Sequence, residues 1–268
     1  DDPCSLFMPK VGTDNVHSEK TQKLIAQMHK AITIIQFKLE AQLIKAHPEY
    51  NMDDRRLLHK INYENGTIEI EGKTYEMNDV NFPTVDRENP YELSSEEKQL
   101  VKELRRMYVN NKRLKQHIEF LYAKGSMYCC FNNNLLYHGC VPLDEDGNFA
   151  VIKLNDKNYK GKDYLDYADK MARKAYFNKN NQDELDFMWY LWCGEKSPLS
   201  GRRIKTFERT FIDDKNAWNE PKNPYYDFYK DEKTCNMILH DFDMYSPMSH
   251  IINGHTPIRV TKGEKPVH

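Results

Sequence analysis

The sequence predicts an α/β protein, and two observations lead to that class. Stretches with apolar residues at helical spacing, above all residues 18–46, are interspersed with short stretches in which apolar and polar residues alternate as in strands. Hydrophobic residues make up 39% and aromatic residues 12% of 268 positions, which argues against wholesale disorder and is enough for a sizeable core.

The first part of the chain is expected to be helical with one hairpin. Ser18 can cap a helix over residues 18–46, which should end before Pro48 because the residue preceding a proline is pushed out of the helical region. The further elements expected here are a β-hairpin over residues 62–78, a helix from Ser94 or Ser95 towards Met107, and a helix over residues 111–123.

The pattern changes at Gly125, where strands become more frequent. Asn132-Asn133 predicts a tight turn between a strand that ends at Phe131 and one that begins at Asn134. The expected elements beyond them are an extended stretch over 150–154, a helix over 163–178, an aromatic and apolar segment over 184–193, a loop-rich segment over 194–236, and a strand over 249–253.

Composition excludes several classes of protein. Lys and Arg number 39 and Asp and Glu 41, and this balance gives no support to a nucleic-acid binder or a membrane-surface binder. No stretch approaches 18 consecutive apolar residues, so no transmembrane helix is expected. Six cysteines without a C-x-x-C pair indicate a reduced, cytoplasmic protein. Buried structural thiols are expected at Cys129, Cys130 and Cys193.

Two histidines are candidate metal ligands. His138 and His255 each follow a predicted strand, and each has a glycine beside it, so both are expected on an exposed rim. Imidazole is a suitable ligand for Zn, Fe and Mn centres. The alternative is that both are ordinary histidines at strand ends. His240, Asp241 and Asp243 could also supply ligands, but a solvated loop is the simpler interpretation.

A basic loop over residues 193–203 is a candidate phosphate-binding element. Backbone N–H groups together with Lys196, Arg202 and Arg203 could surround a phosphate. A plain surface loop with solvated arginines is the alternative.

Several segments resemble known enzymes. The segment 135–142, which carries His138-Gly139, looks like the strand–His-Gly segment of calcineurin-type metallophosphoesterases, and 251–257 resembles the closing Gly-His motif of that superfamily. The wider sequence is similar to the class III (Firmicutes-type) fructose-1,6-bisphosphatases over essentially the whole chain. The matching segments are 9–12, 28–40, 79–84, 124–128, 191–202 and 251–258.

The resemblance implies part of a four-layer metallophosphoesterase sandwich. Residues 1–122 would be a helical and β-hairpin insertion, and residues 123–268 the C-terminal half of the catalytic domain. It also implies a pair of divalent metals, Mn²⁺ foremost, with His138 and His255 among the ligands. Lys196, Arg202 and Arg203 would then bind the substrate phosphate that does not lie on the metals.

The chain also departs from that pattern. Pro257 stands where the superfamily often has a further histidine, and no Asp-x-His, Gly-Asp or Gly-Asn-His block precedes His138. The first residue is Asp1 rather than Met. We therefore expect the later part of a longer enzyme, with the catalytic residues and other ligands in a missing N-terminal part, and this chain alone to be nearly inactive.

The implied reaction is hydrolysis of the 1-phosphate of fructose 1,6-bisphosphate to fructose 6-phosphate in gluconeogenesis. The partners would be this sugar bisphosphate and the missing N-terminal part of the enzyme. No nucleic-acid or membrane partner is expected, and the chain could form a homo-oligomer. Two alternatives stand beside it, a protein serine/threonine phosphatase-like hydrolase and a non-catalytic fragment or binding module.

Overall fold

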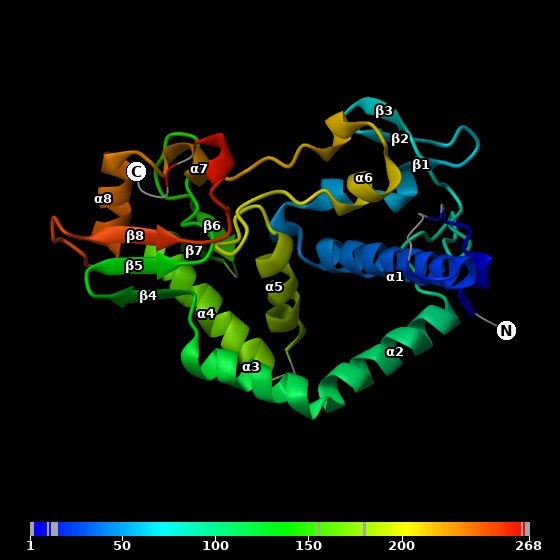
Figure 1. Ribbon diagram of the computed structural model, residues 1–268, viewed down its shortest axis with the longest axis horizontal. Helices are drawn as coiled ribbons and strands as arrows, with labels where there is room; N and C mark the ends of the chain where they lie inside the picture. Colours follow the sequence, from blue (N-terminus) through cyan, green and yellow to red (C-terminus); the bar gives the residue numbers. More distant parts are fainter. Residues whose placement is uncertain are drawn as a thin grey trace. The chain divides into compact units, whose positions relative to one another are not determined.

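The computed structural model describes residues 3–9, 11, 16–154, 156–178, 181–263 and 265 (Figure 1). It confirms a mixed α/β protein with small sheets. The chain divides into two compact units, residues 1–115 with 205–219 and residues 116–204 with 220–268. Of the family-like segment 9–12, Lys10 and Gly12 lie outside the described residues.

The first unit is built around the long helix α1 (Glu19–Ala46). Ser18 caps it as predicted, because its hydroxyl accepts a hydrogen bond from the Thr21 N–H at 3.3 Å. The other helices of this unit are α2 (Ser95–Asn110), the first residues of α3 (Lys112–Lys124), and α6 (Thr206–Phe211). An antiparallel sheet of β1 (Ile61–Asn62), β2 (Thr67–Ile70) and β3 (Lys73–Glu76) contains the predicted hairpin.

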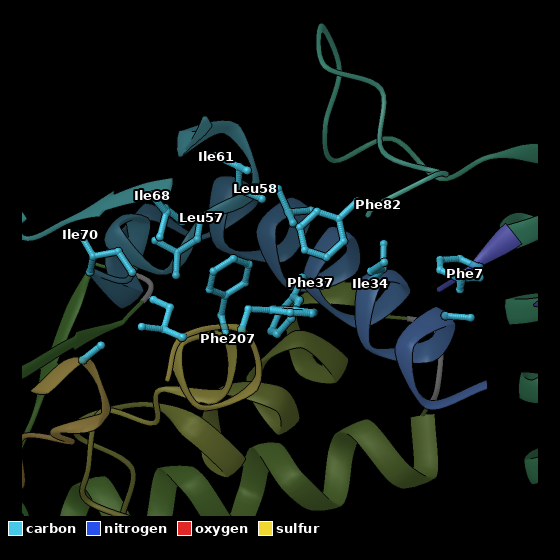
Figure 2. Packing of buried hydrophobic residues seen from close by; sticks show 14 residues of the cluster. Phe7, Ile34, Phe37, Leu57, Leu58, Ile61, Ile68, Ile70, Phe82 and Phe207 are labelled. Atoms are coloured by element: carbon cyan, nitrogen blue, oxygen red, sulfur yellow. The ribbon is translucent and has the colours of Figure 1, made fainter. Parts of the chain in front are cut away.

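The core of this unit joins segments that are far apart in the sequence (Figure 2). Phe37 of α1 packs against Phe207 of α6 with ring centroids 5.2 Å apart. Arg55 holds the buried Glu208 through two hydrogen bonds of 2.7 and 2.6 Å. These contacts explain why residues 205–219 belong to a unit whose other residues precede 116.

The second unit contains the elements that carry the candidate histidines. β4 (Tyr128–Phe131) pairs antiparallel with β5 (Asn134–Tyr137), and β5 pairs in parallel with β8 (His250–Asn253). In Figure 1, β8 lies directly beside β5. A separate hairpin is formed by β6 (Ile152–Leu154) and β7 (Lys157–Tyr159). The helices are the rest of α3, α4 (Gly161–Asn178), α5 (Gln182–Cys193), α7 (Tyr225–Phe228) and α8 (Glu232–Asp241).

The structure adds detail to several predictions about local structure and corrects others. The segment 184–193, for which no secondary structure was predicted, belongs to α5. The segment expected to be loop-rich contains the short helices α6 and α7 and the start of α8 between its loops. Asp241 ends α8, and its carboxylate accepts a hydrogen bond from the Lys162 N–H at 2.5 Å, so it caps α4 rather than lying in a loop. Cys193 is buried as expected, but Cys129 and Cys130 are exposed.

Candidate metal-binding and phosphate-binding site

The parallel pairing of β5 and β8 places the two candidate histidines together. Tyr137 and Asn253 are opposite each other at the ends of these strands. His138 follows Tyr137 directly, and His255 follows Asn253 after one glycine. The Gly254 N–H donates to the His138 carbonyl at 3.0 Å, so the two strand ends stay joined beyond the last pair of the sheet.

The two imidazole rings lie close together in an edge-to-face arrangement. Nε2 of His138 lies 3.2 Å from Nδ1 of His255, and the ring planes meet at 77°. Two nitrogens bound to one ion at about 2.1 Å would lie roughly 3.0–3.4 Å apart in octahedral or tetrahedral geometry. The observed separation is that of a hydrogen bond between the two rings, and it also suits two ligands of a single divalent ion.

The basic loop packs directly against the residues that follow His138. The Cys140 N–H donates to the Pro198 carbonyl at 3.0 Å. A Cβ on Gly139 would lie only 2.6 Å from that same carbonyl oxygen, so a larger residue does not fit there without movement of the backbone. Burial of Cys140 under this loop raises the pKa of its thiol to about 12, which makes it a structural group rather than a nucleophile.

This packing brings Arg202 close enough to His255 for its positive charge to act on that imidazole. Partial burial, the positive charge of Arg202 and the neighbouring His138 lower the pKa of His255, which favours the neutral imidazole that metal binding requires. The Nε atom of Arg202 is buried, and it has no hydrogen-bond partner among the residues that the structure describes.

The other two predicted phosphate-binding residues lie elsewhere on the same loop. Lys196 is exposed, and its backbone N–H donates to the phenol of Tyr190. Arg203 is half-buried, and its backbone N–H donates to the Pro221 carbonyl at 2.9 Å. Of the three basic residues, Arg202 is the one for which the structure describes an interaction with His255.

His138 and His255 fit one part of a metal site. Both supply imidazole nitrogens at a suitable separation, but a divalent ion takes at least four ligands in all. Across the described ranges, no group of three or more His, Cys, Asp or Glu side chains is gathered as metal ligands. In the same part of the chain, no helix has the length and apolar character needed to cross a bilayer.

The whole chain, residues 1–268, matches the family model described as Firmicute fructose-1,6-bisphosphatase. The chain belongs to this family. It is 50% identical over 271 residues to the fructose-1,6-bisphosphatase class 3 1 of Clostridium beijerinckii, covering 100% of this chain and 41% of that protein. It is 51% identical over 274 residues to the class 3 enzyme of Clostridium novyi, covering 99% of this chain and again 41% of the relative.

This member of the fructose-1,6-bisphosphatase family thus spans about two fifths of the length of the curated relatives that it matches, at 41% in each case. No solved structure matches the chain.

Sequence reasoning missed three residues that shape the site. Asn253, Tyr225 and Tyr226 connect the strand ends and the basic loop through hydrogen bonds, of which the bond from the Tyr226 hydroxyl to the Ser200 carbonyl is 3.1 Å long. Asn253 lies inside the family-like segment 251–258, which was a usable signal. The two tyrosines follow Pro224 in the segment expected to be loop, where no sequence periodicity pointed to them.

Proposed function

We propose that this chain is the C-terminal part of a metal-dependent phosphatase that removes the 1-phosphate of fructose 1,6-bisphosphate. The proposal rests chiefly on the juxtaposition of His138, His255 and Arg202 in a chain that matches the fructose-1,6-bisphosphatase family throughout. A cationic guanidinium beside two neutral nitrogen ligands is suited to a phosphate that lies on a metal.

His138 and His255 would hold one ion of a divalent metal pair, with Mn²⁺ as the candidate metal. The remaining ligands and the catalytic residues would come from the part of the longer enzyme that lies outside this chain. When bound, such a pair supplies Lewis-acid activation of the phosphate and lowers the pKa of a water molecule. The histidines themselves contribute uncharged donors, and the lowered pKa of His255 helps to keep it unprotonated near neutral pH.

Different residues of the basic loop would bind the two phosphates of the substrate. The charge of Arg202 acts on His255, so this residue is suited to the phosphate on the metals, through the planar fork of donors of its guanidinium. Lys196 and Arg203 would meet the second phosphate, which needs a cationic site of its own because only one end of a bisphosphate can lie on the metal pair.

The four-layer metallophosphoesterase sandwich is the architecture that we propose for the complete enzyme. Residues 123–268 would form the C-terminal half of its catalytic domain, and residues 1–122 the helical and hairpin insertion. The parallel β5–β8 pair supports this, because parallel strands occur mostly within larger sheets that are covered on both faces. A role in gluconeogenesis in the cytoplasm, without nucleic acid or membrane, follows from the resemblance, and the oligomeric state is left open.

Phosphate release from fructose 1,6-bisphosphate, measured with added Mn²⁺, tests the proposal. The longer enzyme that contains this chain should turn over, and the 268-residue chain alone should be nearly inactive. Turnover of the chain alone near 10 per second, an ordinary enzyme rate, would contradict the placement of essential groups outside it. A longer enzyme that hydrolyses phosphoproteins but not the sugar bisphosphate would overturn the proposed substrate.

A further inference from the structure

A hydrogen-bonded network joins the residues on either side of the histidine pair. The amide nitrogen Nδ2 of Asn253 lies 3.2 Å from the Gly139 carbonyl oxygen and 3.1 Å from the Tyr225 hydroxyl. A carbonyl oxygen can only accept, so the Asn253 atom that faces Gly139 must be the NH₂ group. The two hydrogens of that group therefore serve two partners on different segments of the chain.

The network continues from Tyr225 to the strand that carries His138. The hydroxyls of Tyr225 and Tyr137 are 2.8 Å apart, and both side chains are buried. Burial raises the pKa of both phenols, so they are neutral and able to donate near neutral pH. Tyr137 immediately precedes His138, and Gly139 immediately follows it.

Tyr225 is itself held firmly in place. The Asn223 side-chain oxygen accepts hydrogen bonds of 3.0 Å from the N–H groups of both Tyr225 and Leu143. The Asn223 N–H donates to the Gly201 carbonyl at 2.8 Å, which ties the same segment to the basic loop. Tyr225 is therefore held in place by hydrogen bonds that do not involve the two histidines.

We propose that Asn253 and Tyr225 are positioning residues that fix the separation between the imidazoles of His138 and His255. Asn253 is two residues before His255 and bonds to the residue after His138, so its side chain crosses from one strand end to the other. Backbone pairing fixes the strands up to Tyr137 and Asn253, and the side-chain network extends that alignment to where the histidines begin. This inference rests on the proposed function only for the statement that the paired imidazoles bind metal.

The first measurement needs no metal. Nuclear Overhauser effects between the imidazole protons of His138 and His255 should be present in the metal-free chain and be lost in Asn253→Leu. That variant has nearly the same side-chain volume and removes both hydrogen bonds. Tyr225→Phe should weaken the effect, while Tyr137→Phe should weaken it less because the Asn253–Tyr225 bond survives.

The second measurement is a Zn²⁺ titration of the same proteins by calorimetry. Groups that orient metal ligands typically contribute about 10- to 100-fold in affinity, so Asn253→Leu and Tyr225→Phe should each weaken Zn²⁺ binding about tenfold or more. Tyr122→Phe is the matched control. It removes the 3.0 Å hydrogen bond from the Tyr122 hydroxyl to the Ala172 carbonyl, which joins α3 and α4 in the same unit and is not part of the network of Asn253 and Tyr225. It should lower the melting temperature without changing Zn²⁺ affinity.

The outcomes distinguish the positioning role of Asn253 and Tyr225 from the metal-binding role of the two histidines. The positioning role would be overturned if the nuclear Overhauser effect between the two imidazoles were unchanged in Asn253→Leu. It would also be overturned if Asn253→Leu bound Zn²⁺ with the same affinity as the Tyr122→Phe control. If His138→Ala and His255→Ala bind Zn²⁺ as tightly as the parent chain, the metal role under the proposed function fails, and the ring–ring measurement alone decides the positioning role.

Discussion

Gly139→Ala should damage the site by forcing the basic loop away from His138. The added Cβ would lie 2.6 Å from the Pro198 carbonyl oxygen and 2.7 Å from the Leu199 carbonyl carbon. Both atoms belong to backbone, so the strain cannot be relieved by rotating a side chain. Overpacking of this kind costs about 1–3 kcal/mol, and alanine returns only about 0.4–1 kcal/mol by restricting the unfolded chain. The expected net loss in the free energy of unfolding is roughly 1–2 kcal/mol.

Gly254→Ala is the matched control on the other strand end. Its Cβ would meet His138 Nδ1 at 3.6 Å, an ordinary contact, so this variant should be as stable as the parent or slightly more stable. Urea unfolding can be followed by tryptophan fluorescence, to which Trp189 and Trp192 of α5 contribute from this unit. With an m-value of about 2 kcal/mol/M, Gly139→Ala should lower the midpoint by roughly 0.5–1 M. Equal midpoints for the two alanine variants would refute the close contact between the loop and Gly139.

Three further predictions concern the metal ligands, the basic loop and pH. In the longer enzyme, His138→Ala and His255→Ala should each lose one metal per chain by elemental analysis, while the melting temperature changes little. A variant that retains both metals and normal activity would show that the replaced histidine is not a metal ligand. Arg202→Ala should reduce kcat/KM about 10- to 100-fold on both fructose 1,6-bisphosphate and p-nitrophenyl phosphate, whereas Lys196→Ala should reduce it only on the bisphosphate. If Arg202→Ala reduces kcat/KM only on the bisphosphate, Arg202 binds the phosphate that does not lie on the metals. Burial and the charges of Lys60 and Arg56 lower the pKa of His59 in the folded chain. In the unfolded chain this pKa is about 6.5, so between the two pKa values the unfolded chain binds a proton that the folded chain does not. The free energy of unfolding should therefore rise with pH across that window, and a His59→Gln variant with the same slope would show that His59 is not its source.

The sequence predicted those elements that are determined by local chemistry. The helix over 18–46 was identifiable because Ser18 and Pro48 mark its ends, and α1 spans Glu19–Ala46. The turn at Asn132-Asn133 was identifiable because asparagine tolerates positive φ, and the two residues have φ values of 50° and 57°. The ends of β5 and β8 were likewise predicted closely enough to place each histidine just beyond a strand.

What the sequence could not predict depends on contacts between distant segments. The segment 184–193 contains too many aromatic and apolar residues to show one face, and burial of Phe187, Tyr190 and Leu191 within the fold decides in favour of a helix. Nothing local indicated that Arg202 would approach His255, because that arrangement depends on the loop packing against Gly139. The phosphate-binding roles of Lys196, Arg202 and Arg203 and the metal-binding roles of His138 and His255 stay predictions.

Crystallography of the longer enzyme with Mn²⁺, using anomalous scattering from the metal, tests the central claim most directly. The proposed function predicts an anomalous peak within coordination distance of both His138 Nε2 and His255 Nδ1, the two atoms that face each other at 3.2 Å in this chain. It further predicts that the other ligands of that metal come from residues outside these 268 positions. Metal peaks that lie away from both imidazoles would contradict it.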